Sequence, residues 1–217
     1  MTESDRSAPA RLVSFEGIDG AGKSTLIAGV AEALRTRGVD PLVTREETTG
    51  WLGEAVRRSI DERMDPLATL FLFLADRAHH LAALRPELAR GRLVLTDRYH
   101  DSTRAYQAVT LADRFDDLDG WLKEVSHDWL ITPLRTYLVD IDPEVAVGRM
   151  ADRGSRTNYE KAAFLGKVRS EYLRIVAAEP ERFVVLDGTR PTVELVRVIT
   201  ADLETLGALT PSAAVDG

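Results

Sequence analysis

A glycine-rich stretch near the start of the chain restricts the fold more than any other feature of the sequence. Residues 15–25 read FEGIDGAGKST, between an apolar segment, RLVSF, and a segment with the apolar spacing of a helix, LIAGVAEAL. Within the stretch, Gly17, Gly22, Lys23 and Ser24 match G-x-x-x-x-G-K-[ST], a phosphate-binding loop that joins a strand to a helix. The pattern predicts an α/β domain. The alternative is an ordinary glycine turn that caps a helix.

Short β-rich segments alternate with helical patterns along the rest of the chain. We expect strands at Leu12–Ile18, Val39–Thr44, Arg92–Thr96, Arg135–Ile141 and Arg182–Leu186. Helices are expected near 52–62, 67–89, 101–109, 114–130, 143–151, 158–178 and 191–206. This alternation predicts a parallel sheet covered on both faces. We expect one domain over residues 11–207, with loose ends at 1–10 and 208–217.

The composition excludes several kinds of site. The 217 residues include no cysteine, which rules out disulfides, thiolate metal sites and a cysteine nucleophile. A net charge of -7 argues against a broad nucleic-acid surface but allows a local basic pocket for a phosphorylated small molecule. The longest apolar stretch near the start is too short and too glycine-rich to cross a bilayer. We therefore expect a cytoplasmic protein that binds neither nucleic acid nor membranes.

The phosphate-loop pattern assigns specific chemistry to the residues around it. Backbone N–H groups of such a loop point at phosphate oxygens, and the positive end of the following helix favours negative charge. We expect Lys23 to reach the β and γ phosphates of a nucleotide and the Ser24 hydroxyl to bind Mg²⁺. Asp97 closes an expected strand and can hold Mg²⁺ through water, although it could instead cap the next helix. The adjacent Arg98 is expected to bind phosphate.

Two further groups of residues are candidates for substrate binding. Phe73 and Arg77 are four residues apart in a helical pattern, so they share a face that can stack on a base and read its edge. Residues 148–161 place Arg149, Arg153 and Arg156 in a glycine-containing segment that can close over a transferring phosphoryl group. Alternatively, Phe73 is a core residue and the arginines form a solvated basic loop.

Taken together, these segments resemble a thymidylate kinase of the bacterial type, in the family of P-loop nucleoside monophosphate kinases. The resemblance covers nearly the whole chain. It is carried by FEGIDGAGKST at 15–25, TRE at 44–46, LGEAVR at 52–57, FLADR at 73–77, TDRYHDSTRAYQ at 96–107, the arginine segment at 149–156 and LDG at 186–188. It implies a P-loop NTPase fold, a three-layer α/β/α sandwich with a five-stranded parallel sheet and a short lid at about 149–160. It also implies a homodimer that transfers a phosphoryl group from MgATP to dTMP.

The same resemblance implies roles for individual residues. ATP would be bound by Gly17, Asp19, Gly20, Ala21, Gly22, Lys23, Ser24, Thr25 and Arg149. The acceptor dTMP would be bound by Asp19, Glu46, Arg57, Phe73, Arg77, Arg98, Thr103, Tyr106 and Gln107, with Phe73 stacked on thymine and Arg77 bonded to its O4. Catalysis would rest on Lys23, Arg98, Arg153 and Arg156. The metal region would comprise Ser24, Asp97 and Glu46.

The sequence departs from the family pattern on the acceptor side. REETTGWLGE at residues 45–54 stands where REPGGTPLGE is common, which leaves the loop geometry at Glu46–Glu47 open. A relative that acts on dUMP or on a 5-modified pyrimidine nucleotide remains an alternative. A second alternative is a nucleotide-binding regulator that hydrolyses slowly, although the sequence lacks the N-K-x-D of a GTPase. His79 and His80 are expected to be ordinary helix residues.

Overall fold

The chain folds around a single five-stranded sheet. The computed structural model describes residues 11–150 and 156–209. The strands are β1 (Leu12–Glu16), β2 (Leu42–Arg45), β3 (Val94–Asp97), β4 (Arg135–Asp140) and β5 (Phe183–Asp187). All pairings are parallel, in the order β2-β3-β1-β4-β5. The predicted sheet is thus confirmed.

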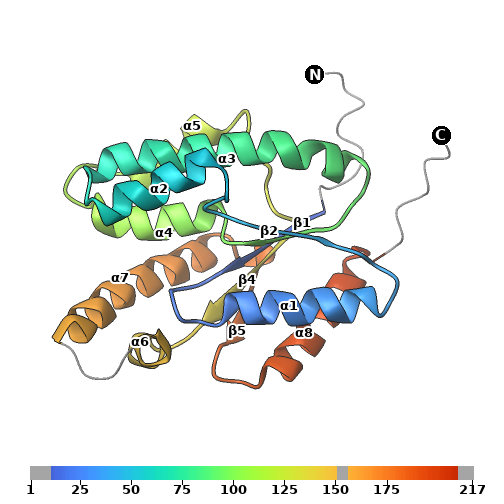
Figure 1. Cartoon of the computed structure of the whole chain (residues 1–217). Helices are drawn as coiled ribbons and strands as arrows, with labels where there is room; N and C mark the ends of the chain where they lie inside the picture. The colour runs from blue at the N-terminus through green and yellow to red at the C-terminus, as the bar shows by residue number, and fades with distance from the viewer. Residues whose placement is uncertain (1–10, 151–155, 210–217) are drawn as a thin grey trace.

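Helices cover both faces of the sheet and make three layers. They are α1 (Lys23–Arg35), α2 (Trp51–Asp61), α3 (Pro66–Ala89), α4 (His100–Thr110), α5 (Leu118–Ser126), α6 (Pro143–Met150), α7 (Arg156–Ala178) and α8 (Thr192–Thr205), with a short 3-10 helix at Pro180–Arg182. In Figure 1, α1 and α8 lie on one face, whereas α3, α4 and α7 lie on the other, with α2 and α5 packed outside them. This is the predicted P-loop NTPase α/β/α arrangement.

The strand register brings the chemistry-bearing strand ends together. Asp97 at the end of β3 lies opposite Phe15 of β1 and Arg45 of β2. The loops that follow these strands therefore start at one edge of the sheet, where a parallel α/β sheet places its ligand crevice.

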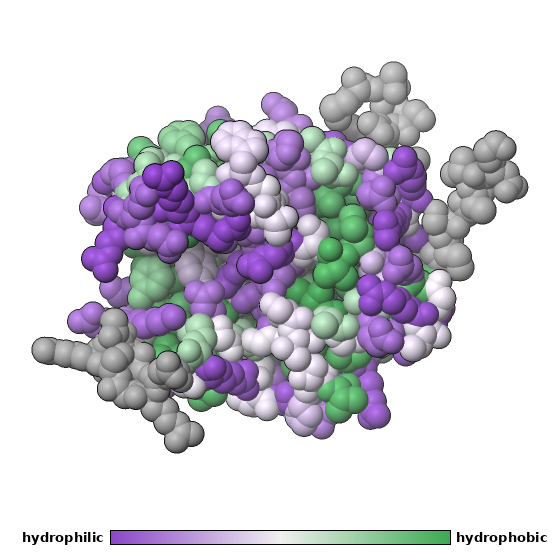
Figure 2. All heavy atoms as spheres, viewed as in Figure 1, coloured by the Kyte–Doolittle hydropathy of each residue, from purple (hydrophilic) through white to green (hydrophobic). Residues whose placement is uncertain are grey.

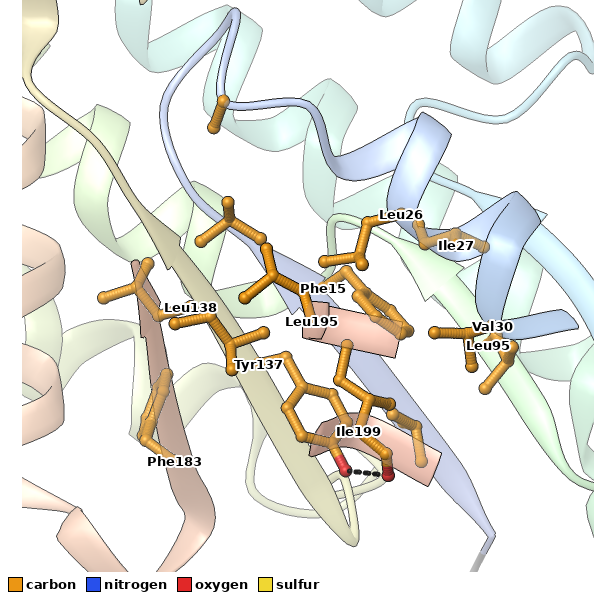
Figure 3. Packing of buried hydrophobic residues seen from close by; sticks show 14 of the residues in the cluster. Phe15, Leu26, Ile27, Val30, Leu95, Tyr137, Leu138, Phe183, Leu195 and Ile199 are labelled. Carbon is orange, nitrogen blue, oxygen red and sulfur yellow. Dashed lines mark hydrogen bonds between the residues drawn. The ribbon is translucent and has the colours of Figure 1, made fainter. Parts of the chain in front are cut away.

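The main core surrounds the sheet, with side chains of α1 and α8 on one face and of α7 on the other (Figure 1). β1 is buried along all five residues, as expected of a central strand with helices on both sides. Phe15 packs on Tyr137 of β4 with 5.4 Å between ring centroids. Figure 3 shows both rings among side chains of α1 and α8, such as Val30 and Ile199. This packing fixes the strand that leads into the phosphate loop.

Some predicted boundaries are wrong. The helix expected over 114–130 is the shorter α5, because the Asp117 side chain accepts from Gly120 N at 2.8 Å and starts the helix there. The packed chain also continues past residue 207, since Ala208 is buried in the core. The expected tails at 1–10 and beyond 209 lie outside the described residues, as does the middle of the expected lid.

Within the described ranges, α3 is the single helix long and apolar enough to satisfy a membrane-span criterion. Its apolar residues Leu70, Leu81 and Leu84 are buried against other parts of the domain. A buried core helix meets the same criterion, and the packing of α3 identifies it as one.

Candidate active site

The phosphate loop between β1 and α1 has the conformation that its glycines allow. Gly17, Gly20 and Gly22 all have positive φ, at 139°, 82° and 93°. A Cβ on Gly17 would lie 2.5 Å from the carbonyl oxygen of Val139, and one on Gly20 would collide with the carbonyl oxygen of Ala146. Positive φ and close backbone approach are what exclude other residues here. The sequence is therefore specific for a tight loop that leads into the N-terminus of α1.

Lys23, the first residue of α1, lies inside this loop. Its Nζ donates to the carbonyl oxygens of Gly17 and Ile18, each at 3.1 Å, and the residue is only 7% exposed. Burial, together with the positive charge of Arg98, lowers the pKa of the Lys23 ammonium to about 7. An anionic group beside it would favour the charged form. The loop is thus arranged to receive negative charge.

Ser24 and Asp97 provide the oxygen ligands of the predicted metal region. Ser24 Oγ donates to Asp97 Oδ2 at 2.5 Å, which joins the start of α1 to the end of β3. No cluster of three His, Cys, Asp or Glu side chains suited to a metal occurs among the described residues. A hydroxyl and one carboxylate fit Mg²⁺, which keeps several waters and takes its other ligands from substrate phosphates.

Glu46, the third residue predicted for the metal region, faces elsewhere. Its Oε2 accepts from Arg77 Nε at 2.8 Å, and its Oε1 lies 3.1 Å from His80 Nδ1. Both carboxylate oxygens are therefore bonded to α3, and the side chain is buried. In this structure the Glu46 carboxylate serves as the counter-ion of Arg77, and a metal role for Glu46 stays a prediction.

Two cavities meet at Asp19 and Arg98. One, of about 390 Å³, is lined by the phosphate loop, Ser24, Thr25, Asp97 and Arg149, and the other, of about 380 Å³, lies between α2, α3, α4 and α7. Asp19 and Arg98 line both. Figure 2 shows hydrophilic side chains gathered over α2, on the outer wall of the second cavity. Two ligands, one bound in each cavity, would therefore both reach Asp19 and Arg98.

Arg98 is held firmly at this junction. One terminal nitrogen donates to Asp19 Oδ1 at 2.6 Å, and the other donates to the Gly17 carbonyl oxygen at 3.1 Å. Its guanidinium carbon lies 5.1 Å from the ring centroid of Tyr106, whose hydroxyl accepts from Asp19 N at 3.1 Å. Arg98 has a φ of 68°, uncommon for a residue other than glycine. Observed strain of this kind clusters at functional sites.

The second cavity contains most of the residues predicted to bind the acceptor. Those that line it are Asp19, Phe73, Arg98, Thr103, Tyr106 and Gln107. Sequence reasoning missed Phe164 of α7, which lies 6.2 Å from Tyr106 between ring centroids and also lines the cavity. The helical pattern around Phe164 does not indicate a binding role, because the packing of α7 on α4 is a tertiary contact that the sequence pattern does not predict.

Arg77 lies one contact behind the cavity wall. It is buried, and its Nη2 donates to Thr103 Oγ1 at 2.8 Å and to the Tyr99 carbonyl oxygen at 3.3 Å. Thr103 lines the cavity, whereas Arg77, although described, does not. In this structure Arg77 reaches the cavity through Thr103, and its direct contact with a base stays a prediction.

Arg57 holds the loop that departs from the family pattern. Its Nη1 donates to the Thr48 carbonyl oxygen at 2.7 Å, while Asp76 accepts from Thr48 N at 2.8 Å and from Thr48 Oγ1 at 2.5 Å. The peptide bond between Glu46 and Glu47 is cis, so the loop keeps this geometry without proline. Like Glu46, Arg57 does not line the second cavity in this structure, and its contact with an acceptor phosphate stays a prediction.

Comparison with known proteins agrees with this geometry. The thymidylate kinase family model matches residues 15–199. The chain belongs to the thymidylate kinase family. It is similar to proteins described as "probable thymidylate kinase" from Methanosarcina mazei, 46% identical over 187 residues (85% of this chain and 91% of the relative), and Natronomonas pharaonis, 42% identical over 198 residues (90% and 98%). These matches cover both cavities.

The segment that the thymidylate kinase resemblance assigns to a lid is described only at its ends. Arg149, at the end of α6, donates to the carbonyl oxygens of Ala21 at 3.4 Å and Gly188 at 3.1 Å, so it borders the phosphate cavity as predicted. Arg153 lies outside the described residues. Arg156 begins α7, and its side chain is not described.

A buried carboxylate behind the thymidylate kinase site was missed entirely. Glu16 accepts from Tyr99 N at 2.8 Å, from Ser102 Oγ at 2.5 Å and from Tyr172 at 3.1 Å. Burial and the negative charge of Asp101 raise the pKa of Glu16 to about 7. In the sequence, Glu16 is an unremarked position between Phe15 and Gly17. Its partners become apparent only from the packing of α4 and α7 against β1.

Proposed function

We propose that this protein transfers the γ-phosphoryl group of ATP to dTMP and forms dTDP and ADP, a step in dTTP synthesis. The observation that carries the proposal is the pair of cavities that share Asp19 and Arg98. A nucleotide triphosphate in the loop cavity would have its γ phosphate at Lys23 and Arg98. A nucleoside monophosphate in the other cavity would direct its phosphate to the same place.

Catalysis in this arrangement is alignment and charge neutralisation. The acceptor's attacking atom is a phosphate oxygen that is already mostly ionised near neutral pH, so no strong general base is required. Arg98 is fixed by Asp19 and the Gly17 carbonyl oxygen. Its single positive charge would lie beside both phosphates. Lys23 adds a second cation on the donor side. Holding both reactants in line accounts for a large part of the rate enhancement in phosphoryl transfer.

Metal and lid complete the proposal. Ser24 and Asp97 would hold Mg²⁺ at the donor phosphates, where the ion supplies charge neutralisation. Arg149, Arg153 and Arg156 would surround the transferring group from a lid at about 149–160. The family resemblance further supports a homodimer that works in the cytoplasm.

The second cavity is suited to a thymine nucleotide. Phe73 and Phe164 supply aromatic surface, while Thr103 and Gln107 supply polar groups for the base edge. Tyr106 lies beside Asp19 and Arg98, where the sugar of a monophosphate would sit if its phosphate reached Arg98. A hydroxyl at C2′ would meet the tyrosine ring, and this favours deoxyribonucleotides.

A kinase assay across acceptors tests the proposal. ADP release with MgATP is measured for dTMP, dUMP, dCMP, dGMP and the ribonucleotide TMP. We expect the highest kcat/KM for dTMP. A higher value for another acceptor would overturn the proposed specificity, and ATP hydrolysis at the same low rate with every acceptor would favour a nucleotide-binding regulator.

A further inference from the structure

His80 makes two side-chain contacts in the interior of the domain. Its Nε2 lies 2.8 Å from Oγ1 of Thr44, which is in strand β2 just before the acceptor loop, and its Nδ1 lies 3.1 Å from Glu46 Oε1. The residue is buried, whereas the preceding His79 on the same helix is exposed. The two histidines, which look alike in the sequence, therefore have different environments.

The partners of His80 determine where its proton lies. Glu46 accepts a hydrogen bond from the permanently charged Arg77, so its carboxylate is the acceptor for His80 as well. Nδ1 must then carry the hydrogen of the bond to Glu46. Thr44, His80 and Glu46 are thus joined in one series of hydrogen bonds.

The series continues to the wall of the base cavity. Glu46 holds the Arg77 guanidinium from one side, and Arg77 donates to Thr103 Oγ1 at 2.8 Å on the other. Because Thr103 accepts this bond, its own hydroxyl hydrogen can be donated to a ligand. At Thr103 the wall therefore offers a hydrogen-bond donor, which suits a carbonyl oxygen. Arg77 behind it has only N–H donors, so it cannot accept from an amino group.

We propose that His80 is a positioning residue for base selectivity: through Glu46 it fixes Arg77 and Thr103 so that the cavity selects pyrimidines with a carbonyl oxygen at C4 over those with an amino group. The inference rests on the proposed function, because it assumes that the cavity between α2, α3, α4 and α7 holds the base of the acceptor. His80 itself does not touch the ligand.

A histidine that only filled space in the core would behave differently. Its loss would weaken the binding of every nucleotide or lower the stability of the fold without regard to the base. The positioning role instead predicts a change confined to one substrate and to one functional group of that substrate. If His80 is removed, the next charged group in the buried series is left displaced or unpaired. The hydrogen bond that this group makes at the cavity wall is then weakened.

The test compares three substitutions whose side chains differ in what they retain. His80→Ala removes both contacts. His80→Asn places an amide nitrogen close to the position of Nδ1, so it keeps the bond to Glu46. His80→Gln extends its amide towards the position of Nε2, so it reaches Thr44 and not Glu46. Equilibrium Kd values for dTMP and dCMP are measured by competition titration, alongside KM for ATP and the Tm of each variant.

We expect His80→Ala to raise the Kd of dTMP about 10- to 100-fold, the range for losing one hydrogen bond to a charged group. The Kd of dCMP and the KM of ATP should change less than about threefold, so the selectivity between the two pyrimidines falls. His80→Asn should recover most of the selectivity and His80→Gln should not. His79→Ala, on the exposed side of the same helix, should match the wild type.

Selectivity that is unchanged in a folded His80→Ala variant, or recovered by His80→Gln rather than His80→Asn, would overturn the proposal. If His80→Ala does not fold, Thr44→Val removes the outer bond with a side chain of similar shape, and we expect a smaller loss of selectivity in the same direction. No such loss in Thr44→Val would then count against the series. Failure of the proposed function is distinguishable, because the wild type itself would then show no preference for dTMP.

Discussion

At the scale of single residues, the site depends on a few charges held in place by backbone groups. Lys23 is the clearest case, because its ammonium is fixed by two carbonyl oxygens and has no carboxylate partner within hydrogen-bond distance among the described residues. Burial disfavours its charge, as the lowered pKa of about 7 records. A phosphate bound beside the Lys23 ammonium would stabilise its charged form.

Replacing Lys23 therefore should damage activity much more than folding. For Lys23→Ala we expect kcat to fall about 10²- to 10³-fold, as for removal of one preorganised donor to a transition-state charge. The Tm should change little, because the substitution removes a buried charge as well as two hydrogen bonds. ADP release in a coupled assay measures the rate, with Lys167→Ala on the exposed side of α7 as the matched control. Near-normal turnover in Lys23→Ala would contradict the assignment.

The structure brings the residues of the contiguous motifs together as the sequence indicates, whereas the partners of residues that act through tertiary contacts were not predicted. Lys23, Ser24, Asp97 and Arg98 lie together because they stand at the start of α1 and at the end of β3, whose places are set by the sheet. The family resemblance implied that Glu46 lies in the metal region. Its side chain bonds α3 in this structure, and the spacing of residues in the sequence does not predict that orientation.

At the scale of elements, α3 anchors the acceptor loop as well as forming a wall of the base cavity. Asp76 and His80 are four residues apart on α3 and so lie on one face of it. On that face, Asp76 bonds Thr48. His80 bonds both Thr44 and Glu46. The loop that departs from the family pattern thus keeps a defined path, held by a helix whose sequence does follow the pattern.

Removing the Asp76 carboxylate should release the loop. Asp76→Ala leaves the Thr48 N–H and hydroxyl without their acceptor, and we expect the free energy of unfolding to fall by about 2–4 kcal/mol with a raised KM for dTMP. Asp76→Asn should recover much of both, because the Thr48 hydroxyl can reverse and accept from the amide. Urea unfolding and steady-state kinetics measure the two effects. Equal losses in the exposed control Asp61→Ala would show that Asp76 has no special role in holding the loop.

At the scale of the whole molecule, a buried carboxylate joins the central strand to the second helical layer. Glu16 of β1 bonds Ser102 of α4 and Tyr172 of α7, and Arg98 donates to both of those hydroxyls, at 3.0 and 3.4 Å. The Glu16 carboxylate therefore connects the sheet to the helices α4 and α7. No sequence pattern predicted this, because the three elements are far apart along the chain.

This charge should be visible in the pH dependence of stability. The pKa of Glu16 is raised from 4.5 to about 7, so between these values the folded state binds more protons than the unfolded one and stability falls as pH rises. Burial lowers the pKa of His100 from 6.5 to about 3, so stability rises with pH in that overlapping range. The two effects oppose each other in the wild type.

Glu16→Gln isolates the second effect. Because the variant cannot ionise at this position, we expect its free energy of unfolding to rise more steeply with pH than that of the wild type, across the range between the ordinary pKa of Glu16 and its raised value. Urea unfolding at several pH values measures both curves. Parallel curves would mean that Glu16 does not titrate in the folded protein in this range.

The central claim is direct phosphoryl transfer between two nucleotides whose phosphates meet at Asp19 and Arg98. The most direct measurement follows the label from ATP labelled in its γ phosphate, with dTMP present, and identifies the labelled product by chromatography. We predict that the label appears in dTDP, one for each ADP formed. Label that appears only as inorganic phosphate, with no dTDP, would contradict the account.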